Sequence, residues 1–180
     1  MKKTNPLCLI YCASPGSFLK LDQLSWLIET CMKSKIFVCL VCTNKYAGNQ
    51  AAVVADFKSM LSKCSNETRD EDGIIYYDDV ALCTTVNNIE YVDTFLKVKQ
   101  PKEGVNELIY GIMVSLKPDL LVGWCYAIEG NDSFWNLMKQ KLTVAFGEFI
   151  RQHGTDIAKS FLDFALAFVR HKYLPAAAPK

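Results

Sequence analysis

Three continuous apolar runs constrain the fold of this 180-residue chain more than any other feature. They cover residues 7–13, 36–42 and 80–86, and none of them alternates polar with apolar side chains. Strands that are covered on both faces have this character, which is typical of a parallel sheet. Parallel neighbours need long crossover connections, and helical periodicity follows each run. The sequence therefore predicts an α/β fold with about three parallel strands and flanking helices.

Apolar residues recur at helical spacing in the segments between and after these runs. Asp22 and Asn49 are the predicted N-caps of the first two helices, and Pro118 ends the third. Tryptophans at helical positions are more often core residues than ligand contacts, so Trp26 and Trp124 are expected in the core, as is Trp135. The predicted helices span about Asp22 to Lys33, Gln50 to Ser62 and Val105 to Leu116.

Between the second and third runs lies a segment that is polar throughout, residues 65–73, and it predicts an exposed loop. The following Ile74-Ile75-Tyr76-Tyr77 is consistent with a short edge strand. The pattern changes after Pro118, where helices are expected at 119–129, 133–153 and 156–172. The predicted organisation is an α/β domain over 1–117, an all-helical C-terminal extension over 118–174 and a disordered tail over 175–180.

The bulk composition excludes several classes of protein. A formal net charge of +1 gives no sign of nucleic-acid binding. No apolar run reaches the roughly 18 residues that a membrane span needs. Five of the eight cysteines lie in the apolar runs, where free cysteine acts as a small hydrophobe. We therefore expect a cytoplasmic protein without disulfides. The Cys39-x-x-Cys42 pair has no second pair or histidine near it, so no metal site is predicted.

No side chain stands out as catalytic. The only histidines, His153 and His171, lie near predicted helix C-termini, where the imidazole suits the helix dipole. Ser14 and Ser17 follow the first run, at an edge where ligands bind in open α/β sheets. No Gly-x-Ser-x-Gly motif surrounds either serine. We therefore expect no catalytic residue and no cofactor.

Four motifs follow the predicted elements in a fixed order. The first strand runs into Ser14-Pro15-Gly16-Ser17-Phe18, the second into Asn44-Lys45-Tyr46-Ala47, the third ends in Cys83-Thr84-Thr85, and the last helix opens with Gly104-Val105-Asn106-Glu107-Leu108. In this order the segment from Leu7 to Leu116 resembles the C-terminal half of a P-loop GTPase domain. The resemblance implies that Asn44, Lys45, Thr84 and Thr85 are vestiges of the base-facing part of a nucleotide site.

The chain also departs from that family. The aspartate of the Asn-Lys-x-Asp motif, which accepts hydrogen bonds from guanine, is replaced by Ala47. Each guanine N–H left unpaired would cost ~1–3 kcal/mol. The 180 residues contain no Gly-x4-Gly-Lys-Ser/Thr string, which in the family holds the phosphates and magnesium. The sequence therefore predicts a degenerate GTPase-like domain without catalysis at the γ-phosphate.

In the family's sheet the first strand of this half is interior, and here its neighbour is missing. An open apolar edge is a predicted association site. We therefore expect a structural or scaffolding subunit in which a protein partner or a second copy covers the strand at 7–13, with Leu7, Leu9 and Tyr11 as interaction residues. Alternatively, the chain still binds a nucleotide, in a GTPase-related protein that a partner chain completes with the phosphate loop.

The last predicted helix carries a second candidate surface. Phe161, Phe164 and Phe168 lie on one apolar stripe, beside further apolar residues. Packing on the chain's own domain, a partner groove or oligomer seam, and a membrane surface all remain open for this stripe. The weakly basic opposite face argues against the membrane.

Overall fold

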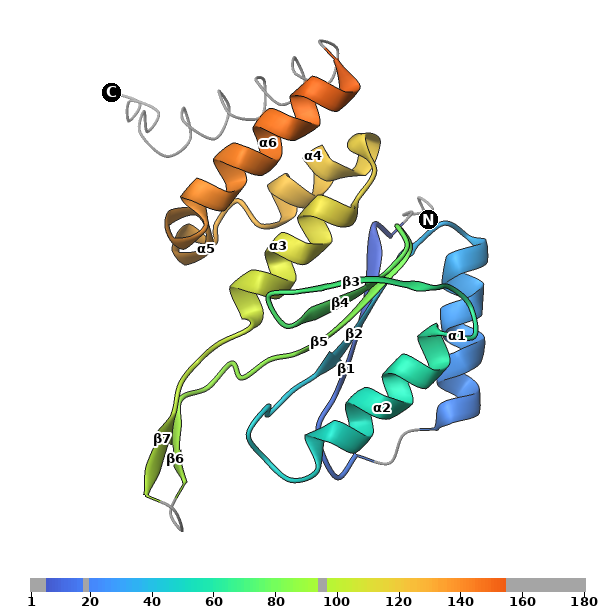
Figure 1. The fold of residues 1–180 in the computed structure, drawn as a ribbon, viewed down its shortest axis with the longest axis vertical. Coiled ribbons are helices and arrows are strands. Elements are labelled where there is room, and N and C mark those ends of the chain that lie inside the picture. The colour runs from blue at the N-terminus through green and yellow to red at the C-terminus, as the bar shows by residue number, and fades with distance from the viewer. Residues whose placement is uncertain (1–5, 18–19, 94–96, 155–180) are drawn as a thin grey trace, which may run out of the picture. The chain divides into compact units, whose positions relative to one another are not determined.

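The computed structural model describes residues 6–17, 20–93 and 97–154. The chain has an α/β fold and divides into two compact units, Met1–Ser115 and Leu116–Lys180. The described part of the first unit contains a mixed five-stranded sheet, a two-stranded ribbon and three helices (Figure 1). The described part of the second unit is helical.

The sheet has the strand order β1-β2-β5-β4-β3. Its strands are β1 (Cys8–Ala13), β2 (Phe37–Cys42), β3 (Glu67–Glu71), β4 (Ile74–Tyr77) and β5 (Ala81–Thr85). The strands β1, β2 and β5 coincide with the three apolar runs, and they pair in parallel. Each of the two parallel pairs needs a crossover connection. The helix α1 (Leu21–Lys33) lies in the connection from β1 to β2, and α2 (Gln50–Leu61) lies in the connection from β2 to β5.

The two faces of the sheet pack against different helices. Leu9 and Tyr11 of β1, with Leu40 of β2, belong to the core that α1 and α2 cover. On the opposite face the helix α3 (Val105–Ser115) lies so close to β4 that a Cβ on Gly111 would come 2.7 Å from Ile74 Cδ1. Coverage on both faces explains why the runs do not alternate.

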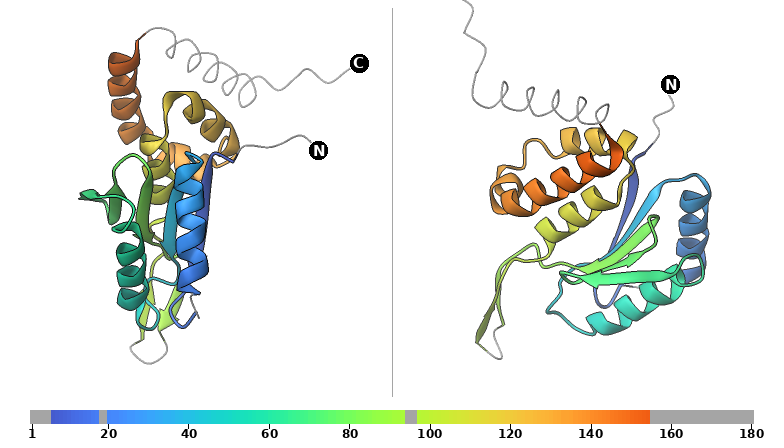
Figure 2. Two further views of the ribbon diagram at one scale, coloured as in Figure 1. Left: turned by 90° about the vertical axis from the view of Figure 1, so that its right-hand side faces the viewer. Right: turned by 45° about the horizontal axis from the view of Figure 1, so that its top comes forward.

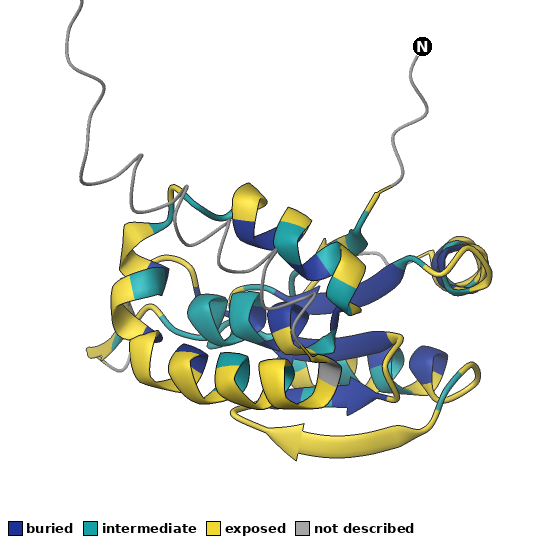
Figure 3. Cartoon of the chain, turned by 90° about the horizontal axis from the view of Figure 1, so that it is seen from above, coloured by how far each residue is buried: buried dark blue, intermediate teal, exposed yellow. Residues whose placement is uncertain are grey.

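The prediction of a loop at 65–73 is wrong, because this polar segment contains the strand β3. Its five residues are all exposed and pair antiparallel with β4 (Figure 3). Because β4 pairs with β5 on its other side, the segment 74–77 is an interior strand rather than an edge. The alternation rule fails for β3 because both faces of this edge strand meet solvent.

A two-stranded ribbon between β5 and α3 was not predicted. It consists of β6 (Tyr91–Asp93) and β7 (Val98–Gln100), which pair antiparallel. The ribbon extends away from the five-stranded sheet (Figures 1 and 2). Its strands are only three residues long, too short for periodicity to reveal them.

The structure shows where the first two helices begin and which of their predicted caps form hydrogen bonds. Asn49 caps α2 as predicted, accepting a hydrogen bond from the Ala52 N–H at 3.3 Å. The cap predicted at Asp22 is wrong, because α1 already begins at Leu21 and Asp22 lies in its first turn. Trp26 is also not a core residue, since its side chain is 67% exposed. It lies about 200° around the helix from the buried Leu24.

The second unit contains α4 (Pro118–Ala127), α5 (Asp132–Leu137) and α6 (Lys139–His153). Asn131 caps α5, accepting a hydrogen bond from the Phe134 N–H at 3.1 Å. The helix predicted over 133–153 is broken at Met138, whose φ of −94° and ψ of 4° leave the helical region. Met138 is buried at the turn between the two helices. The predicted helix at 156–172, the Phe161 stripe and the tail lie outside the described residues.

Candidate functional site

The candidate site lies where the parallel strands β1, β2 and β5 end. Their carboxyl ends meet at one edge of the sheet, and the loops after Ala13, Cys42 and Thr85 gather there. Backbone hydrogen bonds join these loops. The Thr43 N–H donates to the Ala13 carbonyl oxygen at 2.8 Å, and the Lys45 N–H donates to the Val86 carbonyl oxygen at 3.2 Å. Ligands bind at this edge in open α/β sheets.

The Asn44-Lys45-Tyr46-Ala47 segment forms a tight turn in the middle of these loops. Asn44 is exposed and has a φ of +55°, in the left-handed region that asparagine tolerates better than most residues. Its carbonyl oxygen accepts a hydrogen bond from the Ala47 N–H at 2.8 Å. The left-handed backbone conformation of this turn is therefore a reason for an asparagine at position 44 that does not depend on a ligand.

A cluster of three polar side chains ties this turn to the segment before α3. The Lys45 ammonium lies 2.6 Å from Oε1 of Glu103, and the Tyr46 hydroxyl donates a hydrogen bond to the same oxygen. The pKa of Glu103 lies below its ordinary value of 4.5, first because Lys45 donates a hydrogen bond to it and then because Tyr46 does. The predicted base-facing lysine is thus already bound to a carboxylate of its own chain.

This cluster should make stability depend on pH. The folded state lowers the pKa of Glu103, so its stabilising effect is complete above the unfolded pKa and is lost as pH falls through the folded pKa. We expect the difference in unfolding free energy between the parent and Glu103→Gln to be constant near neutral pH and to shrink below 4.5. Urea denaturation at a series of pH values measures it. In a Lys45→Met background this dependence on pH should be weaker. A free-energy difference that stays the same at every pH would contradict the stabilising role of the Glu103 carboxylate.

The buried Asn87 anchors the ribbon at the same place. It is 2% exposed, and its Nδ2 donates to the carbonyl oxygens of Ile89 at 2.9 Å and Pro101 at 2.6 Å. Its backbone also exchanges two hydrogen bonds with Glu103. Glu103 therefore contacts both the Lys45 turn, through its side chain, and Asn87 at the base of the ribbon, through its backbone. Sequence reasoning missed Asn87 and Glu103, because neither belongs to a motif and only the fold pairs Asn87 with Glu103 and Glu103 with Lys45.

The predicted base-facing threonines do not complete the site. Thr84 is buried, and its Oγ1 donates to the Gly73 carbonyl oxygen at 2.9 Å, in the turn between β3 and β4. Thr85 is half-buried at the end of β5, where its carbonyl oxygen faces Gly104. The structure thus brings Lys45 together with Glu103, while the Thr84 hydroxyl binds a backbone carbonyl in the turn between β3 and β4.

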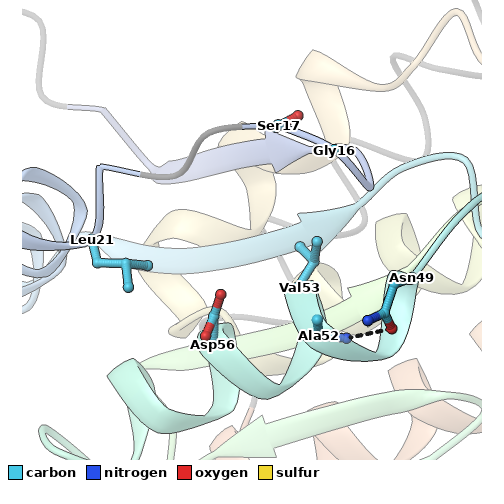
Figure 4. Close-up of a pocket in the computed structure, with 7 residues that line it drawn as sticks. All are labelled: Gly16, Ser17, Leu21, Asn49, Ala52, Val53 and Asp56. Carbon is cyan, nitrogen blue, oxygen red and sulfur yellow. Dashed lines mark hydrogen bonds between the residues drawn. The ribbon is translucent and has the colours of Figure 1, made fainter.

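A cavity of about 300 Å³ lies beside this edge, between the first loop and the two crossover helices (Figure 4). Asp56 contributes a carboxylate to it, and Asn49 lines it while capping α2. Ser14 does not line it, and its Oγ lies 3.0 Å from Oγ of Ser17. The lining residues are Gly16, Ser17, Leu21, Asn49, Ala52, Val53 and Asp56. Among the described residues, this lining includes no basic side chain that could bind a phosphate group.

Among the described residues β1 is an edge strand, and its most exposed side chains are not those predicted as interaction residues. Leu7, Leu9 and Tyr11 are half-buried, and the Tyr11 ring packs edge-on against Phe57, with centroids 6.2 Å apart. The exposed side chains of β1 are Ile10, at 41%, and Cys12. Alternation in the strand assigns them to the face opposite α1 and α2. Of the other predicted interaction residues, Phe161, Phe164 and Phe168 lie outside the described part of the chain.

The eight cysteines are free thiols. Burial raises the pKa of Cys83 to about 12, as expected for a thiol in an apolar core. Cys42 packs in the core under α1 and α2, and Cys39 points to the other face, beside Cys8. Among the described residues there is no group of three or more side chains that could hold a metal ion. Within the same residues, every helix is too short or too polar to cross a membrane.

Comparisons of the chain with protein-family models, with curated proteins and with solved structures found no match.

Proposed function

We propose that this chain is a non-catalytic, GTPase-like structural or scaffolding subunit that associates with itself or within a larger protein assembly. The observation that carries the proposal is the edge position of β1. Among the described residues it pairs with β2 alone. Its sequence, Cys8–Ala13, contains no charge and no proline. Natural proteins protect exposed edges with charges, prolines or bulges, so an apolar, regular edge favours association.

The loop chemistry also supports a role without catalysis. The Lys45 ammonium and the Tyr46 hydroxyl both engage Glu103, and the Thr84 hydroxyl engages the Gly73 carbonyl. A nucleotide would have to compete with these contacts. The 180 residues also contain no phosphate-binding loop. We therefore infer that the loops hold the ribbon and the sheet together rather than act on a phosphate.

One experiment tests the proposal on the full chain. Size-exclusion chromatography with light scattering should give a mass above that of one 20.3 kDa chain. Hydrogen exchange should show slow exchange at the amides of Cys8, Ile10 and Cys12. The same sample should not hydrolyse GTP when magnesium is added. A monomer whose β1 amides exchange fast would overturn the proposal, and so would magnesium-dependent turnover.

A second candidate is a nucleotide-binding, GTPase-related protein completed by a partner chain that supplies the phosphate loop. The observation in its favour is that Asn44 and Lys45 directly follow β2, at the edge of the sheet where the carboxyl ends of the parallel strands meet. A titration with GTP, ATP and their nucleosides separates the two. The chain alone should bind nucleosides weakly and without regard to magnesium if this candidate holds, and not at all if the loops are purely structural.

A further inference from the structure

The backbone of β1 presents one set of hydrogen-bonding groups outward. The Ala13 carbonyl oxygen accepts from the Thr43 N–H, so Ala13 faces β2. Because backbone groups alternate along a strand, Leu9 and Tyr11 face β2 as well. The N–H and C=O groups of Cys8, Ile10 and Cys12 therefore point away from the sheet. We call these groups the open edge of β1.

The two edges of the sheet are built differently. The far edge, β3, carries Glu67, Arg69, Asp70 and Glu71, all exposed, and its register with β4 is irregular between Glu67 and Arg69. Charges and irregularities of this kind discourage strand pairing. The strand β1 has neither, and it pairs one-to-one with β2 from Cys8 to Ala13. Of the two edges, β1 is therefore the one suited to pair with a further strand.

The open edge of β1 is also compatible with itself. An antiparallel strand pair exchanges hydrogen bonds between directly opposite residues, at every second position. A pair centred on Ile10 places Ile10 opposite its own copy and Cys8 opposite Cys12, and so engages every outward group of the strand. A pair centred on Tyr11 would instead call on Ser14, whose N–H already donates to Ser17 Oγ at 3.1 Å.

We propose that β1 pairs antiparallel with β1 of a second copy, with Ile10 opposite Ile10, to form one continuous sheet across the dimer. The proposal rests on the association proposed above and names its partner and register. On the face opposite α1 and α2, Ile10 meets Ile10, and Cys8 meets Cys12. On the helix face, Leu9 meets Tyr11 at a non-hydrogen-bonded position, where side chains approach most closely. No charged side chain of β1 enters the contact.

The helix side of the edge has room for a second copy. A cavity of about 310 Å³ lies between β1 and α1, lined by Tyr11, Lys20, Gln23, Leu24 and Leu27. A two-fold axis normal to the sheet would bring α1 of the two copies together on this face. Trp26 of α1 is 67% exposed, and an exposed apolar side chain of this size is more common at interfaces than on free surfaces.

Thiol cross-linking tests the register directly. In a Cys64→Ser background, which removes the exposed thiol outside β1, Cys8→Ser and Cys12→Ser chains are expressed separately and together and treated with a short bis-maleimide. The register places Cys8 about 5.5 Å, Cα to Cα, from Cys12 of the other copy. Two Cys12 residues would lie about 14 Å apart along the strands. Cross-linked dimer should form from co-expressed chains and be absent from either variant alone.

The outcomes separate this inference from the proposed function. Cross-linking in a single variant, or none in the co-expressed sample while light scattering still reports an oligomer, would overturn the register and leave the association standing. A larger assembly formed only with a different protein would overturn the homotypic pairing. A monomer in every sample, with β1 amides that exchange fast, would overturn both.

Charge substitutions at the centre of the contact provide a second test. Ile10 is exposed, so Ile10→Lys and Ile10→Glu should fold, but each places like charges opposite each other in the dimer. We expect each to weaken dimerisation roughly tenfold or more, and the two variants together to restore it. The matched control is Val98→Lys, which adds the same charge at a 48%-exposed position of β7 and should not change dimerisation. Failure of the two charges to rescue each other would contradict the two-fold at Ile10.

Discussion

Replacing Gly104 by alanine should lower the free energy of unfolding of the α/β unit by roughly 2–5 kcal/mol. The backbone at Gly104 has a φ of +86°, which costs a residue with a Cβ about 1–2 kcal/mol. A Cβ there would also lie 2.6 Å from the Thr85 carbonyl oxygen and 3.1 Å from Val86 Cα. Both neighbours are backbone atoms, so they cannot move aside as a flexible side chain would. Urea denaturation followed by far-ultraviolet circular dichroism measures the loss.

Gly16 provides the matched control for this substitution. Its φ of +85° is almost the same, but a Cβ there would have no neighbour within 4 Å. Gly16→Ala should therefore lose only the conformational part, about 1–2 kcal/mol. The difference between the two variants isolates the close approach of the α3 entry to the end of β5. Equal losses would mean that this approach does not constrain the fold.

Phe57→Ala should destabilise the same unit by about 3–5 kcal/mol. Phe57 is fully buried at the centre of the core between α2 and the sheet. Removing its ring leaves a cavity beneath the helix and takes away the edge-on contact with Tyr11 of β1. The loss should also loosen β1, because the half-buried Tyr11 ring packs against Phe57. The urea midpoint and hydrogen exchange at the β1 amides measure the two effects.

Two comparisons sharpen the Phe57 prediction. Ser59→Ala changes an exposed position of the same helix and should alter stability by less than about 0.5 kcal/mol. A double-mutant cycle with Phe57→Leu and Tyr11→Leu should give a coupling of about 0.5–1.5 kcal/mol, the usual range for an aromatic pair. Additive losses would show that the two rings do not stabilise each other.

The Gly104 and Phe57 variants also inform the proposed association. If the sheet forms its contact through β1, then Phe57→Ala should weaken dimerisation through Tyr11, whereas Gly104→Ala acts at the far end of β5. Light scattering of both variants, under conditions where each stays folded, compares them. An equal effect on dimerisation would argue for a contact elsewhere on the molecule.

Part of the fold could be read from local sequence. The runs at 7–13, 36–42 and 80–86 identify β1, β2 and β5 because burial on both faces leaves a continuous apolar signature. The amphipathic faces of α1, α2 and α3 are equally local, and so is the Asn49 cap. A short strand at 74–77 was predicted as well, but not the strand β3 that makes it an interior strand, because a charged edge strand resembles a loop.

The candidate site divides in the same way. The sequence by itself singled out Asn44 and Lys45 through their resemblance to the Asn-Lys-x-Asp motif, and the same resemblance predicted that the strand at 7–13 lacks a neighbour on one side. Only the tertiary structure brought Glu103 and Asn87 to that turn, turned the Thr84 hydroxyl toward Gly73, and exposed Ile10 rather than Leu9 and Tyr11. The reason is physical: periodicity records how deeply a segment is buried, whereas the partner of a polar side chain, and the covered face of an edge strand, depend on elements far away in the chain.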